Sequence, residues 1–193
     1  EVVGEMTDII RKQMYYVGFR QALSPVVDIT RDPRWGRITE TYGEDAALTS
    51  AMASAFVKGI QGDELKEGVL ATAKHFAGHG ITEGGLNMGR NIVSERDMRE
   101  IHCKPFQCAI TEAGLKSVMN SYCSVNGEPV VGSKKMLTDI LRGEMGFQGF
   151  VVSDYLSLDR LVDPFAVAEN FEEAGIRACL LYTSPSPRDP KTS

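Results

Sequence analysis

A carboxylate that comes directly after an apolar run is the sharpest chemical signal in this sequence. Asp154 follows the run at 149–152, with only Ser153 between them. The carboxyl ends of parallel strands open on the ligand site in α/β proteins, and a carboxylate buried there needs a compensating partner. Asp154 is therefore a candidate site residue. The alternative is that it caps the next turn or pairs with an arginine.

Two other apolar runs also end in reactive side chains. Lys74 and His75 end the run that begins at Val69, and an Asn-Ser-Tyr triplet ends the run at 117–122. A lysine at a strand end can form a Schiff base, bind hydroxyl groups or donate to an ion pair. The adjacent His75 disfavours a purely structural ion pair.

The adjacency of Lys74 and His75 makes a specific demand on the backbone. Consecutive side chains of a regular strand point to opposite faces. If both side chains reach one pocket, the backbone must leave regular strand geometry there. We therefore predict a bulge or a non-proline cis peptide at Lys74–His75.

The segment 31–45 is strongly polar and contains the only tryptophan of the chain, Trp35, between Arg34 and Arg37. An arginine can fork onto two hydroxyl groups, and an aromatic face can stack on the C–H bonds of a sugar. This combination favours a sugar or another polyol as ligand. The alternative is that the arginines and carboxylates of the segment pair with one another and only fix the loop.

Composition excludes several classes of protein. The 193 residues are 42% hydrophobic and 24% charged, which argues against disordered and fibrous classes. The 21 basic and 26 acidic residues give a net charge of −5, which disfavours nucleic acid and anionic membranes as partners. No apolar run reaches the roughly 18 residues of a transmembrane helix, so no membrane span is predicted.

No metal or organic cofactor is predicted. The four cysteines contain no CxxC pair, and neither nucleotide-binding glycine pattern, GxGxxG or GxxxxGK[ST], occurs. Cys103 and Cys108 are interpreted as ordinary half-buried thiols. His102 has no second ligand at metal-binding spacing and is interpreted as structural.

The elements that must position these residues follow a repeating pattern. Apolar runs at 24–29, 69–74, 117–122 and 150–154 are predicted strands, and their starts are 45, 48 and 33 residues apart. A strand with its crossover helix needs about 30 residues or more, so the spacing predicts a parallel α/β fold. About four βα units are visible. Pattern alone leaves a closed eight-stranded barrel and an open doubly wound sheet equally open.

Helical periodicity fills the intervals between the predicted strands. Pro105 is expected to kink or divide the third helix, and an Asp-Pro pair marks the start of the fifth. The predicted helices cover 2–17, 48–60, 94–114, about 133–142 with Gly143 as the stop, and a segment that begins at Asp163–Pro164 and ends near residue 178.

The two ends of the chain are treated separately. Residues 179–193 carry three prolines in a serine-rich stretch and are predicted to be a non-native or disordered tail, outside a domain at 1–178. Because the chain opens on Glu1 and not on methionine, we expect further sequence upstream. The sequence assigns no cellular compartment.

Four motifs, read together, resemble the N-terminal catalytic domain of glycoside hydrolase family 3, the β-glucosidase and β-xylosidase group. They are SPVVDITRDPRWGRITETYGED, KHFAGHG, SVMNSY and LRGEMGFQGFVVSDY, in this order and spacing. The resemblance extends over residues 1–178. It implies a (β/α)8 TIM-type barrel, of which this α/β chain holds about half, and so favours the barrel over the open sheet.

The resemblance also implies roles for individual residues. Asp154 corresponds to the catalytic nucleophile of the family, which forms a covalent glycosyl-enzyme that water hydrolyses with retention. Arg37, Lys74 and His75 correspond to residues that hold hydroxyl groups of the nonreducing-end sugar. The implied activity is that of an exo-acting β-glycosidase on terminal β-linked glucose or xylose, a carbohydrate substrate.

Three further positions line the same pocket in the resemblance. Met119 and Tyr122 belong to SVMNSY, and Tyr122 is expected to donate a hydrogen bond to the nucleophile. Tyr155 stands where the family commonly has tryptophan, and it keeps an aromatic wall beside Asp154.

The sequence departs from a complete family member in one respect. A retaining mechanism needs a second carboxyl as acid/base, which glucosidase-type relatives usually take from a following domain that this chain lacks. The β-N-acetylglucosaminidase subgroup carries an Asp-Ser-His after KHFPGHG, and the stretch ITEGGLNMGRN has none. The chain is therefore expected to be inactive alone.

Two alternatives to a β-glycosidase remain open. One is a non-catalytic sugar-binding barrel, and the other is a Schiff-base aldolase or lyase that uses Lys74.

Overall fold

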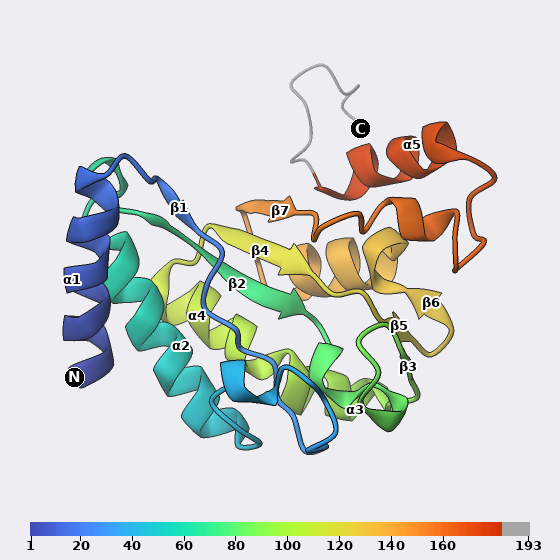
Figure 1. Ribbon diagram of the computed structural model, residues 1–193, viewed down its shortest axis with the longest axis horizontal. Coiled ribbons are helices and arrows are strands. Elements are labelled where there is room, and N and C mark those ends of the chain that lie inside the picture. The colour runs from blue at the N-terminus through green and yellow to red at the C-terminus, as the bar shows by residue number, and fades with distance from the viewer. Residues whose placement is uncertain (183–193) are drawn as a thin grey trace.

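Four parallel strands form the central sheet of the computed structural model, which describes residues 1–182 (Figure 1). Successive strands of the chain are direct neighbours in the order β1-β2-β4-β7, and every pair is parallel. A doubly wound sheet would reverse its order partway, whereas a barrel keeps it. The prediction of a partial (β/α)8 TIM-type barrel is confirmed. The bounds are Gln21–Ala22 (β1), Leu70–Phe76 (β2), Ser117–Asn120 (β4) and Phe150–Val152 (β7).

Helices connect the strands and cover one face of the sheet (Figure 1). A second, small sheet lies beyond the carboxyl ends of β2 and β4 and consists of Arg90–Asn91 (β3), Ser124–Val125 (β5) and Glu128–Pro129 (β6). The α-helices are Val2–Tyr16 (α1), Ala46–Gln61 (α2), Glu95–Asp97 (α3), Lys104–Ala113 (α4) and Phe171–Tyr182 (α5). Two further helical segments, Met98–His102 and Lys135–Glu144, have the wider turns of a π-helix. Short 3-10 turns occupy Ile38–Glu40, Leu65–Glu67, His79–Ile81, Glu83–Gly85, Val130–Gly132 and Asp159–Leu161.

The core lies between the sheet and its helices. β4 is buried along its whole length. Phe76 of β2 meets Phe106 of α4 edge-to-face, with ring centroids 5.1 Å apart. The sheet is therefore anchored to its helix layer directly beneath the strand that ends in Lys74 and His75.

Pro105 divides the third helical segment as predicted. Ser94 accepts a hydrogen bond from the N–H of Asp97 and caps α3. Pro105 then stands in the first turn of α4, where its missing N–H costs nothing. Gly114 ends α4 in the left-handed region, with φ of 63°.

Two helix boundaries differ from prediction. The fifth helix begins at Phe171, not at Asp163, because Ala166 has φ of 50°, which a right-handed helix does not permit. Asn170 is the true cap and accepts the N–H of Glu173. The fourth helix continues past Gly143 to Glu144, and the chain turns at Gly146, which has φ of 69°.

The first strand and the tail also differ from the predicted bounds. β1 lies at 21–22, and pairing at 24–29 is limited to single bonds and one bridge, such as the N–H of Val27 to the carbonyl of Lys74. Pro25 has no N–H to donate and interrupts the ladder. α5 continues past residue 178 to Tyr182. The rest of the predicted tail lies outside the described residues.

No helix within residues 1–182 is both long enough and apolar enough to cross a membrane.

α1 and α2 approach closely because of one glycine. A Cβ added to Gly59 would lie 2.0 Å from the hydroxyl oxygen of Thr7 and 2.5 Å from the carbonyl oxygen of Gly4. Thr7 is fully buried, and its hydroxyl donates to the carbonyl of Val3 at 2.8 Å. The contact therefore has no room for a methyl group.

We expect Gly59→Ala to destabilise the protein by about 1–3 kcal/mol, because α1 must move away from α2. Gly175→Ala is the matched control, since a Cβ at this helical glycine of α5 meets no atom within 4 Å. The control should be neutral or stabilising by up to about 1 kcal/mol. Thermal unfolding midpoints measure both, and equal midpoints for the two variants would contradict the packing described.

Candidate active site

The site residues come from the loops that leave the carboxyl ends of the strands. Asp28 lies beyond β1, His75 lies near the end of β2, Asn120 ends β4, and Asp154 follows β7. The parallel order of the strands brings all four to one edge of the sheet. The strand ends predicted from the sequence therefore identify the edge of the sheet at which the site lies.

His75 is the buried centre of this edge. Its Nδ1 lies 2.8 Å from Oδ2 of Asp28, and the same oxygen accepts the backbone N–H of His75 at 3.1 Å. Its Nε2 lies 3.0 Å from Nη1 of Arg37. A guanidinium only donates, so Nε2 must accept, and the ring proton must lie on Nδ1 and point to Asp28. The contacts thus define one tautomer of His75.

The backbone at Lys74–His75 departs from regular geometry, as predicted. The Lys74–His75 peptide is cis, as is Phe76–Ala77, and the pairing of β2 with β4 shifts register between Lys74 and Phe76. Lys74, where this shift begins, is half-buried, and the charges of Arg37 and Asp154 act on its ammonium group. The two consecutive side chains therefore reach the same site.

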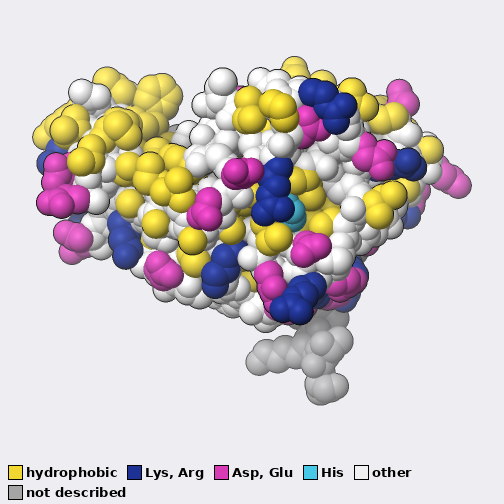
Figure 2. All heavy atoms as spheres, turned by 90° about the horizontal axis from the view of Figure 1, so that it is seen from below, with side chains coloured by type: hydrophobic (Ala, Val, Ile, Leu, Met, Phe, Trp, Pro, Cys, Tyr) yellow, Lys and Arg dark blue, Asp and Glu magenta, His cyan; other side chains and the backbone are white. Residues whose placement is uncertain are grey.

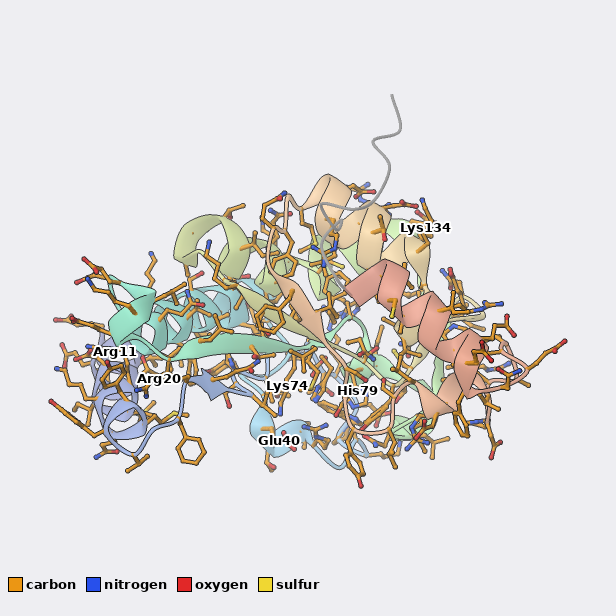
Figure 3. All side chains as sticks on the ribbon, turned by 90° about the horizontal axis from the view of Figure 1, so that it is seen from above. Arg11, Arg20, Glu40, Lys74, His79 and Lys134 are labelled. Carbon is orange, nitrogen blue, oxygen red and sulfur yellow. The ribbon has the colours of Figure 1, made fainter. Side chains whose placement is uncertain are left out.

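Lys74 keeps an uncommitted ammonium group. No hydrogen bond or ion pair joins its Nζ to another of the described residues. Burial, and next the charge of Arg37, lower the pKa of Lys74 below its ordinary value, against the opposing attraction of Asp154 and Glu40. Figure 3 shows Lys74 beside the short turn that carries Glu40, with His79 farther along the same side.

Two arginines of the polar loop pair with its carboxylates, as in the second interpretation given from sequence, and Trp35 is buried and presents no open face for a sugar. Within the described part of the chain, Arg34 pairs with Asp32 alone, at 2.7 Å, and so helps to fix the loop. Arg37 forks onto both oxygens of Glu40, each at 2.7 Å, and also reaches His75. Hydrogen bonds from Arg37 lower the pKa of Glu40. Figure 2 shows a histidine ring framed by basic and acidic side chains near the middle of one face.

Asp154 holds one carboxylate oxygen and leaves the other uncommitted. Its Oδ1 accepts the N–H of Tyr155 at 2.7 Å. Its Oδ2 is buried, lies 3.8 Å from Nε2 of His75, and has no hydrogen-bond partner within the described part of the chain. The side chain is 14% exposed. One oxygen is thus fixed by its own turn, and the other faces the site.

Asn120 holds the turn that carries Asp154. Its Oδ1 accepts the N–H of Asp154 at 3.3 Å, and its Nδ2 donates to Oγ of Ser157 at 2.8 Å. Asn120 is fully buried. The strand next to β7 therefore fixes the loop of the carboxylate, a role that the sequence pattern did not assign to this residue.

The three remaining predicted residues take different positions. Met119 is buried in β4, in register with Lys74. The hydroxyl of Tyr122 donates to the carbonyl oxygen of Tyr155 at 2.6 Å and also interacts with the carboxylate of Asp154. Burial, and next the charge of Asp154, raise the pKa of Tyr122 to about 12. The side chain of Tyr155 is 77% exposed and lies at the rim.

Sequence reasoning missed two members of the site, Asp28 and His79. Asp28 follows Val26 and Val27 just as Asp154 follows an apolar run, so the same signal was present. His79 lies between two glycines, Gly78 and Gly80, and no other reactive residue adjoins it in the sequence. It is fully buried, and its ring centroid lies 4.6 Å from that of His75, 5.3 Å from that of Trp35 and 5.9 Å from that of Tyr122.

Asp28 and Glu40, the two other carboxylates that contact the residues of the site, are both held ionised. Burial alone would raise the pKa of Asp28, but attraction to His75 and its two hydrogen bonds keep that pKa below the ordinary value. Glu40 is held ionised by Arg37. A general acid must keep its proton near the working pH, so neither carboxyl fits that role. Within residues 1–182, no group of three or more His, Cys, Asp or Glu side chains is arranged to hold a metal.

The half-barrel and the polar cluster at its carboxyl edge are those of the (β/α)8-barrel class. The model of the glycosyl hydrolase family 3 N-terminal domain matches residues 1–186, and the chain belongs to this family.

Relatives and solved structures agree with this assignment. A β-xylosidase of Formosa agariphila is 40% identical over 91% of this chain, and a probable β-glucosidase C of Aspergillus flavus is 38% identical over 80%. The structure of a β-glucosidase from Listeria innocua in complex with glucose superposes with a TM-score of 0.87 at 35% identity, over 92% of this chain. The chain spans about a quarter of the length of these relatives, 25%, 26% and 25% respectively.

The burial of His79 predicts acid sensitivity. Burial lowers its pKa from 6.5 to about 4. As the pH falls below 6.5, the unfolded chain binds a proton at this residue, while the folded chain remains neutral until about pH 4. Between pH 7 and 4.5 this difference should cost about 2–3 kcal/mol of stability.

We expect His79→Gln, which cannot titrate, to lose less thermal stability between pH 7 and 4.5 than the unaltered protein. The comparison is of the two pH-induced shifts in unfolding midpoint, so a general destabilisation by the substitution cancels. A variant with an undiminished shift would show that His79 does not remain neutral in the folded state.

Proposed function

We propose that the chain is the nucleophile-bearing part of a retaining, exo-acting β-glycosidase that releases terminal β-linked glucose or xylose. The observation that carries the proposal is the carboxylate of Asp154, with one oxygen fixed by its turn and the other facing His75. The names of the relatives, β-xylosidase and β-glucosidase, support the substrate class. The complex of the Listeria innocua enzyme with glucose supports it as well.

The proposed reaction uses the free oxygen of Asp154 as nucleophile. Oδ2 forms a bond to the anomeric carbon as the glycosidic C–O bond breaks, and the leaving oxygen takes a proton from a general acid. Water then attacks the same carbon, releases the carboxylate and gives the sugar with retained configuration. The fixed Oδ1 limits rotation of the carboxylate during both steps.

The cations of the site suit the hydroxyl groups of the sugar. The ammonium of Lys74 is free to donate, and the guanidinium of Arg37, which is bonded to His75, lies in the same site. Met119 and Tyr122 would form the pocket wall, with Tyr155 at the rim. Contacts of this kind stabilise the transition state when they tighten as the ring distorts.

The general acid must come from elsewhere in the full-length protein. Asp28 and Glu40 are both held ionised, and the chain corresponds to about a quarter of its relatives. The missing carboxyl would belong to a C-terminal domain. The 193-residue chain alone is then expected to bind sugar weakly and to turn over none.

A Schiff-base lyase that uses Lys74 is the second candidate. The lowered pKa of Lys74 favours it, because the neutral amine is the nucleophile in that chemistry. Borohydride reduction with a carbonyl substrate would then attach the substrate to Lys74. No attachment is expected for a glycosidase.

In the full-length protein, Asp154→Asn should reduce hydrolysis of nitrophenyl β-glucosides and β-xylosides by roughly 10³-fold or more, because the nucleophile is lost. Sugar affinity should persist, since the amide has the shape of the carboxylate. In the unaltered full-length protein, a 2-fluoro glycoside should form a covalent bond to Asp154, which peptide mass spectrometry would detect. A full-length protein that binds sugar but hydrolyses neither glycoside would instead identify a non-catalytic sugar-binding barrel.

Lys74→Ala should lower kcat/KM by roughly 10- to 100-fold, the usual cost of one charged hydrogen bond to a substrate hydroxyl. Lys134→Ala is the matched control, since Lys134 is exposed, pairs with Asp139 and lies away from the site (Figure 3). The control should retain full activity. Equal activity of both variants would remove Lys74 from the sugar site.

A further inference from the structure

We propose that Arg160 selects for a leaving group that carries a carboxylate, as a uronic acid unit does. The inference rests on the proposed glycosidase function and deepens it, because it assigns a substrate class to the leaving side of the site. It concerns a residue that neither holds the nonreducing-end sugar nor takes part in the bond changes at Asp154.

Arg160 lies beside the nucleophile, on the loop that leaves β7. It belongs to the short turn Asp159–Leu161, and its guanidinium carbon lies 5.0 Å from the centre of the Tyr122 ring. The hydroxyl of the same tyrosine interacts with the carboxylate of Asp154, and the charges of Asp154 and Arg160 both act on it. Tyr122 is therefore in contact with both residues, with Asp154 at its hydroxyl end and Arg160 over its ring face.

The guanidinium of Arg160 has no anionic partner within residues 1–182. Its Nε is buried without a hydrogen-bond partner, whereas the two Nη atoms, which also have none among the described residues, remain accessible. Arg37 and Arg177, by contrast, each pair with a glutamate, at 2.7 and 2.8 Å. The ring of Tyr122 attracts the cation but supplies no oxygen to accept an N–H. Because buried donors without acceptors are rare in folded proteins, Arg160 is a cation that calls for an anion from outside the described chain.

The order of the strands places Arg160 on the leaving side of the site. The side chains that are proposed to hold the nonreducing-end sugar come from β2 and from the loop after β1, whereas Arg160 follows β7, at the other edge of the four-stranded sheet. An exo-acting enzyme holds one sugar on the nonreducing side of the scissile bond, so groups on the β7 side of the site meet the unit that leaves. The exposed ring of Tyr155 belongs to the same loop.

A cation in this place compensates the charge of such a substrate. The carboxylate of Asp154 would repel an anionic leaving group that approaches the reacting carbon, and the ionised Glu40 would add to this repulsion. The charge of Arg160 offsets both effects. Its accessible Nη groups lie in one plane, which suits donation to the two oxygens of a carboxylate. A neutral leaving unit gains no comparable attraction from Arg160.

The test uses full-length protein and pairs of aryl β-glycosides that differ in one group of the leaving phenol, a carboxylate or its neutral carboxamide, in the meta or the para position. For at least one position, Arg160→Met should lower kcat/KM for the carboxylate substrate by roughly 10- to 100-fold, the usual cost of a charge-assisted hydrogen bond. The loss for the matching carboxamide should stay below about threefold. Because each leaving group is compared with itself in two proteins, differences in intrinsic leaving ability cancel.

Two further variants complete the comparison. Arg160→Met keeps a flexible apolar chain on the ring of Tyr122, and Arg160→Lys keeps the charge without the planar fork. Arg160→Lys should lose roughly three- to tenfold on the carboxylate substrate alone, and it serves if Arg160→Met does not fold. Arg177→Met is the matched control, since Arg177 is exposed on α5 and pairs with Glu173. It should leave the hydrolysis of both substrates unchanged.

The second step of the reaction separates a contact with the leaving group from an effect on the nucleophile. The leaving group has departed before water attacks the glycosyl-enzyme, so hydrolysis of the 2-fluoro glycosyl-enzyme should change less than about twofold in Arg160→Met. Slower hydrolysis of this intermediate, or an equal loss for carboxylate and carboxamide substrates, would show that Arg160 only supports Tyr122 and the turn of Asp154. Either result would overturn the inference, as would carboxylate substrates that do not respond to the substitution.

Activity of the unaltered full-length protein separates the two levels of the proposal. A protein that hydrolyses none of the glycosides refutes the proposed function, and the inference with it. A protein that hydrolyses them with no dependence on Arg160 refutes only the selection of charged leaving groups.

Discussion

A carboxylate removed from water must find hydrogen-bond donors within the protein, and this constraint shapes the whole carboxyl edge of the sheet. Asp28 meets it through Oδ2, which accepts two N–H groups of His75, while its buried Oδ1 has no partner among the described residues. Asp154 meets it only in part, with one oxygen bound to the N–H of Tyr155 and the other without a partner among the described residues. The two carboxylates differ in exposure, because the side chain of Asp28 is 1% exposed and that of Asp154 is 14% exposed. The second is left with capacity for chemistry.

The strands hold the carboxylates of Asp28 and Asp154 in their different surroundings. The residues at the centre of the site lie at or beyond the carboxyl ends of paired strands, and the register shift between Lys74 and Phe76 gives two consecutive side chains access to one space. Asn120, at the end of the adjacent strand, holds the turn of Asp154. The position of each functional group is therefore set by a neighbouring strand as much as by its own. Residues built on strands are placed more accurately than residues held by a loop alone.

Much of this arrangement follows from the sequence, and the reasons are local. The apolar runs before Lys74 and Asp154 predicted parallel strands, and the adjacency of Lys74 and His75 predicted the irregular backbone between them. Choosing the barrel over the open sheet needed the family resemblance, because periodicity does not specify the order of strands. The strand order in the structure then agreed with that choice.

Other features depended on contacts that no pattern reveals. The start of α5 depends on the left-handed conformation of Ala166, which overrides a favourable Asp-Pro signal. The hydroxyl of Tyr122 is directed to a backbone carbonyl, a choice made by tertiary geometry. Asp28 carried the same signal as Asp154, but its role became visible only when His75 was found beside it.

Because Tyr122 donates its hydrogen bond to the backbone carbonyl of Tyr155, the backbone and the side chain of Tyr155 have separate roles. The peptide group at position 155 helps to anchor the loop, and any amino acid provides a peptide group. The aromatic ring at that position is largely in solvent and takes no part in that anchor. Under the proposed function, a substitution at position 155 would change the rim of the sugar site and leave the carboxylate of Asp154 in place. Divergence of substrate preference among descendants of such a domain would then need few compensating changes.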